Sequence, residues 1–253
     1  MIQERNTPFT ARSVLASALL GMDPPELPVS QLVRLTGLFG ISENRARVAL
    51  SRMVSAGEAV SSGSGSYRLA GHLIERQSRQ SASRSGIRSP YTGEWQLVVV
   101  TTSGSTADIR AERRRALAYA RLAELREGVW MRPDNVAVVI PAEVARDLDV
   151  MTARPDDPHR LVGQLWDVSG WSQQADALVD QLAALVPDGP IALAPGFALS
   201  AAVLRHLQAD PLLPEQLLPS DWPGERLRRV YDQWDREYRD TLAAWSRASE
   251  PYG

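Results

Sequence analysis

The clearest alternation of apolar and polar positions lies near the start of the chain, between residues 29 and 57. Leu32, Val33, Leu35 and Leu38 recur at helical spacing and predict a short helix that Ser30 caps. The pattern breaks at Gly40-Ile41, and Ser42 is expected to cap a second helix. The apolar face of that helix is predicted to consist of Ala46, Leu50, Met53 and Val54.

The opposite face of the second helix is rich in arginine and polar side chains. It carries Asn44, Arg45, Arg47, Ser51 and Arg52. A helix with one apolar face and one arginine-rich face, following a tight turn, is typical of the helix-turn-helix motif. The pattern therefore predicts that this helix enters the major groove of DNA.

The flanking segments favour the same interpretation. Residues 60–69 predict a hairpin with a Gly/Ser tip, which would form the wing of a winged helix. Residues 11–20 predict the remaining helix, capped by Thr10, with a stiff proline-rich loop after it. A three-helix module used only for protein contacts is the alternative. The predicted DNA-contacting residues are Ser42, Asn44, Arg45, Arg47, Ser51, Arg52, Ser64, Ser66 and Arg68.

The middle of the chain alternates between strand and helix patterns. We expect strands at 96–101, 127–133, 136–140 and 150–153, a helix at 107–125, and a short helix that opens at Pro141. This order, βαββαβ, is that of a ferredoxin-like domain, in which two helices cover one face of an antiparallel sheet.

The last third of the chain is predicted to be helical. Helices are expected from Ser169 to Val186, over 197–207 and over 225–248. The last has an aromatic stripe, which is most simply a core face and alternatively the lining of a ligand pocket. Its polar face should remain solvated and consists of Arg228, Arg229, Asp232, Asp235, Arg236 and Asp240. A helix over 71–84 and a flexible Ser/Arg segment at 85–90 follow the hairpin. The sequence thus predicts an α+β multidomain protein with domains at 1–88, 89–157 and 158–253.

Charge is distributed unevenly along the chain. Residues 1–90 hold 11 arginines and 6 acidic residues, whereas the remainder holds 17 and 24, which together give the net charge of −2. The excess of arginine in residues 1–90 favours contacts of this region with phosphate groups. There is no cysteine, so disulfides and thiolate sites are excluded. Because neither a signal peptide nor a sufficiently long apolar run is recognised, the expected location is cytoplasmic.

Several motifs resemble the PaaX-type transcriptional regulators, repressors of phenylacetic acid catabolism. They are TARSVLASALLG, GISENRARVALSRMVSAG, GEWQLVVV, REGVWMRPDN and, most specifically, DPLLPEQLLPSDWPG. The resemblance implies a winged-helix domain, a central domain similar to the Cas2 fold and a helical C-terminal domain. It further implies a homodimer that represses transcription on a palindromic double-stranded DNA operator, and release by an aromatic or other acyl-CoA effector. Of these implications, the pattern of the residues themselves indicates only the three-part layout and the basic charge of residues 1–90.

Two other functions are consistent with parts of the pattern. A Cas2-like nucleic-acid-processing enzyme would need an aspartate at the end of its first strand, where this chain has Val100-Thr101-Thr102. The second of these functions is that of an adaptor, which would bind an acyl-CoA or a protein without binding DNA. We predict no enzyme, catalytic residue, metal site or cofactor. The residues that would bind an effector are unknown; Arg160, Arg205, Arg226 and Arg228 could meet CoA phosphates, but salt bridges explain each equally well.

Overall fold

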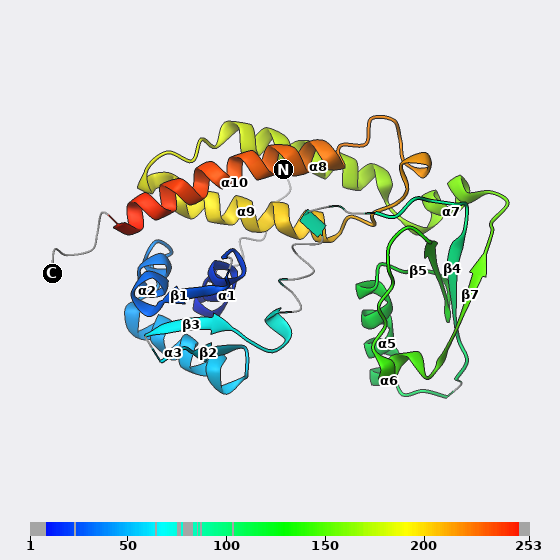
Figure 1. Ribbon diagram of the computed structural model, residues 1–253, viewed down its shortest axis with the longest axis horizontal. Coiled ribbons are helices and arrows are strands. Elements are labelled where there is room, and N and C mark those ends of the chain that lie inside the picture. The colour runs from blue at the N-terminus through cyan, green and yellow to red at the C-terminus, as the bar shows by residue number, and fades with distance from the viewer. Residues whose placement is uncertain are drawn as a thin grey trace. The chain divides into compact units, whose positions relative to one another are not determined.

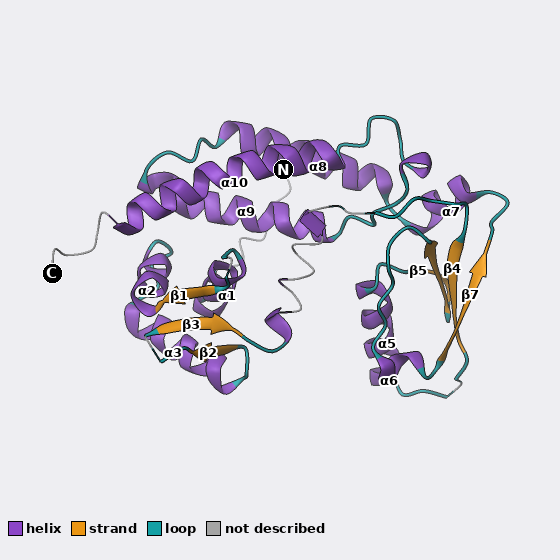
Figure 2. Cartoon of the chain, in the orientation of Figure 1, coloured by secondary structure: helices purple, strands orange, loops and turns teal. Residues whose placement is uncertain are grey.

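The structure is a computed structural model that describes residues 9–22, 24–63, 65–74, 77, 83–84, 86, 88–102 and 104–247. These residues form helices and two small antiparallel sheets, which confirms an α+β chain (Figures 1 and 2). The chain divides into two compact units. Unit 1 comprises residues 1–84, 178–208 and 228–253, and unit 2 comprises residues 85–177 and 209–227.

The front of unit 1 consists of three helices and a three-stranded sheet. Its elements are α1 (Ala11–Leu20), β1 (Glu26–Pro28), α2 (Val29–Gly37), α3 (Glu43–Ser55), β2 (Ala59–Ser61) and β3 (Ser66–Leu69). β3 is the central strand and pairs antiparallel with both β1 and β2. Thr10 caps α1 as expected, because its hydroxyl accepts a hydrogen bond from the backbone N–H of Ser13 at 3.1 Å.

Two expectations for this region were wrong. Ser30 is not the cap of α2, because the helix begins at Val29 and Pro28 occupies the cap position. The proline-rich segment before it is not only a loop, since Glu26–Pro28 is paired with Ser66–Arg68 as β1. Proline is tolerated there because β1 is an edge strand of the sheet. Of the helix predicted at 71–84, the described residues are 71–74, 77, 83 and 84; Gly71 is a turn residue and the others are helical.

The rest of unit 1 is built mainly from α9 (Leu193–Gln208) and α10 (Gly224–Arg247), with the end of α8 (Val168–Ala184). α9 and α10 run side by side (Figure 1). The predicted aromatic stripe of α10 is largely buried: Tyr231, Trp234 and Tyr238 all face the interior. Trp234 and Tyr238 are stacked at 5.1 Å, and the Tyr238 hydroxyl donates to the backbone carbonyl of Leu193 at 2.9 Å.

The polar face predicted for α10 is only partly solvated. Arg229, Arg236 and Asp240 are exposed. Arg228 and Asp235, however, are each 3% exposed, which corrects the expectation. The partners that allow their burial come from residues 83 and 84: Arg228 donates to the Ser83 carbonyl, and Arg84 binds Asp235.

Residues 190–208, which include α9, are long and apolar enough by composition to cross a membrane, a property that the sequence analysis did not recognise. α9 nevertheless buries Leu193, Val203 and Leu207 against the rest of unit 1. Core helices of globular proteins meet the same criterion of length and composition, so the stretch is weak evidence for a membrane span.

Unit 2 contains a four-stranded antiparallel sheet in the order β5-β6-β4-β7. Its elements are β4 (Trp95–Val100), α5 (Ala107–Tyr119), β5 (Ala123–Arg126), β6 (Val129–Pro133), α6 (Ala142–Ala145) and β7 (Leu148–Ala153). Val98 and Trp130 pack against Leu117 of α5 and Val144 of α6. Trp95 and Met131 pack instead with Leu161 of α7 (Pro158–Leu165), a helix that the sequence analysis did not predict.

The predicted order βαββαβ is present, but with different strands. The helix predicted over 107–125 ends at Tyr119, because Arg121 adopts a positive φ of 64° and Ala123–Arg126 pairs with β6 as an edge strand. The strand predicted at 136–140 is irregular backbone instead. Val138 and Ile140 of this segment pack against the apolar cluster of the sheet, which accounts for their apolar pattern without strand pairing.

Candidate nucleic-acid interface

α3 separates buried from exposed side chains along its length. Ala46, Leu50 and Met53 are almost completely buried, as the periodicity predicted. Val54 is 39% exposed, so its assignment to the apolar face was wrong. The six predicted contact residues of this region are all exposed: Ser42, Asn44, Arg45, Arg47, Ser51 and Arg52. Ser42 occupies the N-cap position, although its side chain makes no capping hydrogen bond.

The three arginines of α3 differ in their partners. Arg47 donates to the carboxylate of Glu43 one turn earlier, at 2.8 Å. Both side chains are more than half exposed, and such an i,i+4 ion pair contributes only about 0.3–0.5 kcal/mol, so a phosphate can displace it. Arg45 and Arg52 have no ion pair or hydrogen-bonding partner among the described residues, and their guanidinium groups are free to bind an external acceptor.

Val48 is an exposed residue of the same helix that the sequence analysis missed. The residue is 43% exposed. It follows Asn44 by four residues and precedes Arg52 by four, so helical geometry places the three on one face. The spacing alone could have identified it, because Val48 lies one helical turn from both Asn44 and Arg52.

The hairpin lies next to α3, with β2 in contact with the helix (Figure 1). Its tip is closed by a backbone hydrogen bond of 3.0 Å from Ser62 to Ser66, and Gly63 and Gly65 have φ values of 70° and 77° that favour glycine. Arg68 is exposed and Ser66 is half-buried. Ser64 lies outside the described residues.

Glu58, three residues after the end of α3, binds Arg12 of α1. It is buried, and it accepts a hydrogen bond of 2.8 Å from Nε of Arg12 and a second from the other guanidinium nitrogen. Nε2 of His72 lies 3.8 Å from Oε1 of Glu58. The hydrogen bonds from Arg12 hold the pKa of the Glu58 carboxyl below its usual value, against the opposing effect of burial. The segment directly after α3 is thus joined to α1 by an ion pair.

The end of β4 carries no carboxylate of its own. Thr102 accepts a hydrogen bond of 3.2 Å from Arg113, and Arg113 lies 3.8 Å from Asp147. Within the described part of the chain, no group of three or more His, Asp or Glu side chains is suited to hold a metal ion.

The four arginines considered for an effector lie in different settings. Arg228 is buried and donates a hydrogen bond to the Ser83 carbonyl. The guanidinium of Arg226 lies 3.6 Å from the carboxylate of Asp176. Arg160 donates to Gln164 at 3.3 Å. Arg205 lines a cavity of unit 1.

Comparison with known proteins identifies the family. Residues 10–73 match the family described as PaaX-like protein, and residues 166–248 match the PaaX-like protein C-terminal domain. No protein with a curated description matches the chain. Among solved structures, the chain is similar to the uncharacterized protein Rv0674 from Mycobacterium tuberculosis, with 42% identity over 93% of this chain and 98% of that chain and a TM-score of 0.75. The chain therefore belongs to the PaaX-like protein family.

Proposed function

We propose that this protein is a DNA-binding transcriptional repressor that reads its operator with α3. The observation that carries the proposal is the exposed face of α3, where Arg45 and Arg52 lie without partners among the described residues. Arginine bonds the edge of guanine in two places, and asparagine does the same for adenine, so Asn44 is suited to the same task. Val48 adds an apolar side chain of the kind that contacts the methyl group of thymine.

The order α1-β1-α2-α3-β2-β3 supports the interpretation of residues 1–88 as a winged helix. In this arrangement α2 and α3 form the helix-turn-helix, and the β2–β3 hairpin is the wing. Arg68, Ser66 and Ser64 of the hairpin would bind phosphate, which positions the protein on the duplex without reading sequence.

For residues 89–157 we propose a Cas2-like packing domain rather than a nuclease. The order of elements and the antiparallel sheet support the ferredoxin-like fold. At the end of β4, Thr102 is engaged by an arginine, and a hard divalent cation would need charged oxygen ligands there instead. Incubation of labelled DNA and RNA with magnesium tests this assignment. Cleavage that a chelator abolishes would contradict it.

The repressor is proposed to act as a homodimer on a palindromic operator and to be released by an acyl-CoA effector. Two α3 helices related by a two-fold axis would need a spacing of roughly 34–36 Å to enter successive major grooves. The effector must favour a state in which that spacing is lost, and its effect is limited by its differential affinity for the two states. Light scattering on the purified protein measures the oligomeric state directly.

Binding to labelled DNA from the region beside its own gene tests DNA recognition. Fluorescence anisotropy would compare the unmodified protein with Arg45→Ala and Arg52→Ala. The loss of one good base contact costs about 1–3 kcal/mol, roughly five- to 150-fold in affinity. Arg229→Ala is the matched control, because this arginine is also exposed on a helix but lies on α10. Equal binding by all four proteins would contradict the assignment, and absence of any DNA binding would favour an adaptor.

A further inference from the structure

A cavity of about 460 Å³ lies inside unit 1, between its N-terminal elements and the helices α9 and α10. Ala18 of α1 and Leu35 of α2 line one side, and Leu204 of α9 and Leu242 of α10 line the other. Small-molecule sites have volumes of roughly 300–1,000 Å³, and this cavity falls within that range. Because its walls come from opposite ends of the sequence, the cavity exists only when these segments are packed together.

The walls of the cavity are mainly apolar. Phe197 and Trp245 add aromatic surface to the aliphatic side chains of the four helices. Phe197 also belongs to a cluster with Phe9 and Phe39, with ring centroids 6.2 and 5.2 Å away. An apolar cavity with a few polar groups selects a ligand with an aromatic or aliphatic body.

One positively charged side chain of the lining is available to a ligand. Arg205 of α9 lines the cavity, is exposed, and has no ion pair or hydrogen-bonding partner among the described residues. Arg239, by contrast, is engaged by the carboxylate of Asp235 at 2.8 Å. The carboxylate of Asp240 also lines the cavity. Arg205 is therefore the side chain to which an anionic group would bind, while the apolar body lies against the apolar walls.

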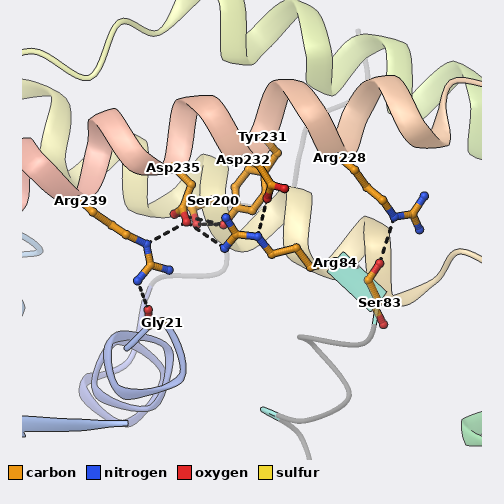
Figure 3. A network of polar contacts seen from close by, with 9 residues as sticks. All are labelled: Gly21, Ser83, Arg84, Ser200, Arg228, Tyr231, Asp232, Asp235 and Arg239. Atoms are coloured by element: carbon orange, nitrogen blue, oxygen red, sulfur yellow. Dashed lines mark hydrogen bonds and ion pairs between the residues drawn. The ribbon is translucent and has the colours of Figure 1, made fainter. Parts of the chain in front are cut away.

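Ser200, Tyr231, Asp235 and Arg239 of the cavity lining belong to a network of polar contacts (Figure 3). At its centre is Asp235, which accepts hydrogen bonds from Arg84 at 2.9 Å and from Arg239 at 2.8 Å. Tyr231 donates to the same carboxylate at 3.5 Å, and its hydroxyl oxygen is 2.8 Å from that of Ser200 on α9. Burial and the charge of Asp235 raise the pKa of Tyr231 above its usual value, so the phenol stays protonated and can donate.

Two contacts that border the cavity connect α10 to the N-terminal helices. Arg239 also donates to the backbone carbonyl of Gly21, directly after α1 (Figure 3). Arg34 of α2 donates to the backbone carbonyl of Trp245 at 3.0 Å, and its guanidinium lies 4.3 Å from the centre of the Trp245 ring. Gly21, Arg239 and Trp245 all line the cavity. A ligand inside it would therefore touch residues of both contacts.

We propose that this cavity binds an amphipathic organic anion, with its apolar body between α1, α2, α9 and α10 and its anionic group on Arg205. Occupancy changes the contacts that Arg239 makes with Gly21 and that Trp245 makes with Arg34, and so the way α1 and α2 are held against α10. Because α1 and α2 pack against α3, this is a route from the ligand to the DNA-reading helix. The regulatory part rests on the proposed function, whereas ligand binding does not.

The fluorescent probe 8-anilinonaphthalene-1-sulfonate tests the cavity, because it combines an aromatic body with one anionic group. Titration should show saturable binding at one site. Ala201→Trp fills the cavity and should weaken binding by about tenfold or more. Ala202→Trp is the matched control, since Ala202 lies next to Ala201 on the same helix but does not line the cavity. Equal binding by both variants, or no saturable binding by the unmodified protein, would overturn the proposal.

Arg205→Gln tests whether Arg205 binds the anionic group of the ligand. Because Arg205 is exposed, this variant should fold, so the test remains decisive even if Ala201→Trp misfolds. It should weaken binding of the sulfonate probe by about fivefold. The neutral analogue N-phenyl-1-naphthylamine should bind both proteins alike. Equal losses for the two probes, or none for either, would remove Arg205 from the site.

Hydrogen exchange tests the coupling without DNA. Saturating probe should change the exchange of backbone amides in α1 and α2 of the unmodified protein, and this response should be reduced in Arg239→Met. No response in the unmodified protein would overturn the coupling. If the operator is then identified, linkage requires that DNA and probe change each other's affinity by the same factor. If the protein bound the probe and showed these exchange responses but did not bind DNA, the proposed function would be contradicted and the cavity proposal would stand.

Discussion

Asn135 donates a hydrogen bond of 2.9 Å from its side-chain amide to the backbone carbonyl of Leu212, 77 residues later in the chain. Leu212 has a φ of 52°, a conformation that a leucine rarely adopts, and its side chain is buried. The guanidinium of Arg132 donates to the Pro211 and Leu212 carbonyls as well. Burial, with the neighbouring charge of Arg121, lowers the pKa of Arg132 to about 10. These contacts hold the Asp210–Pro214 segment in its strained conformation.

Asn135→Ala should therefore destabilise the protein. It leaves a buried carbonyl without one of its donors, which costs about 1–3 kcal/mol of the free energy of unfolding. Urea denaturation followed by tryptophan fluorescence measures the change. Asp156→Ala, at an exposed position in the same unit, should change stability by less than about 0.5 kcal/mol. Equal stability of the two variants would show that the Leu212 contact is dispensable.

Gly196→Ala should destabilise unit 1, although alanine favours helices. A Cβ at Gly196 would lie 2.6 Å from a ring carbon of Tyr238. That ring is held by its stacking on Trp234 and by the hydrogen bond to Leu193, so it cannot move aside. The clash costs about 1–3 kcal/mol and outweighs the gain of up to about 1 kcal/mol in helix propensity.

Gly163→Ala provides the matched comparison, because nothing lies within 4 Å of the added Cβ and the residue is exposed in α7. This variant should stabilise the protein by about 0.5–1 kcal/mol. Calorimetry measures both variants. The packing of α9 on α10 would have to be looser than described if Gly196→Ala were stabilising too.

The pairing of Glu58 with Arg12 should make stability depend on pH. Because the pKa of Glu58 is lowered in the folded protein, the pair stabilises it above the unfolded pKa of about 4.3. That contribution is lost as the pH falls through the folded pKa. Arg12 is about half exposed, so we expect Glu58→Gln to cost at most about 1 kcal/mol at pH 7.

Denaturation of the unmodified protein and of Glu58→Gln between acidic and neutral pH measures this effect. The difference in stability between the two should shrink as the pH falls. In an Arg12→Met background the substitution of Glu58 should lose most of its pH-dependent effect. A constant difference across the pH range would mean that the carboxylate acts through packing alone.

Salt dependence should separate phosphate contacts from base contacts in α3. Each phosphate contact contributes about 0.9 to the slope of log affinity against log salt concentration on double-stranded DNA. Arg52→Ala and Arg45→Ala should each either lower this slope by about one or relax the sequence preference at one position of the site. Anisotropy titrations at several salt concentrations measure both quantities. A variant that changed neither would exclude that arginine from the interface.

The sequence by itself determined the features that depend on local periodicity. α1, α3 and α10 were predicted close to their observed limits, because a 3.6-residue repeat of apolar side chains is present within each segment. The exposure of Arg45, Arg47 and Arg52 follows from the burial of Ala46, Leu50 and Met53 on the same helix. The family resemblance rests on contiguous motifs of the sequence, and the matches to the PaaX-like protein family confirm it.

The tertiary structure alone decided the features whose partners lie far away in the sequence. Asp235 is buried rather than solvated because Arg84 reaches it from 151 residues earlier. Residues 123–126 are a strand rather than the end of a helix because β6 offers them an edge to pair with. The cavity is likewise made by segments from both ends of the chain. A local pattern records which face of an element is apolar, but burial of a charge, strand pairing and a cavity depend on long-range contacts that periodicity does not specify.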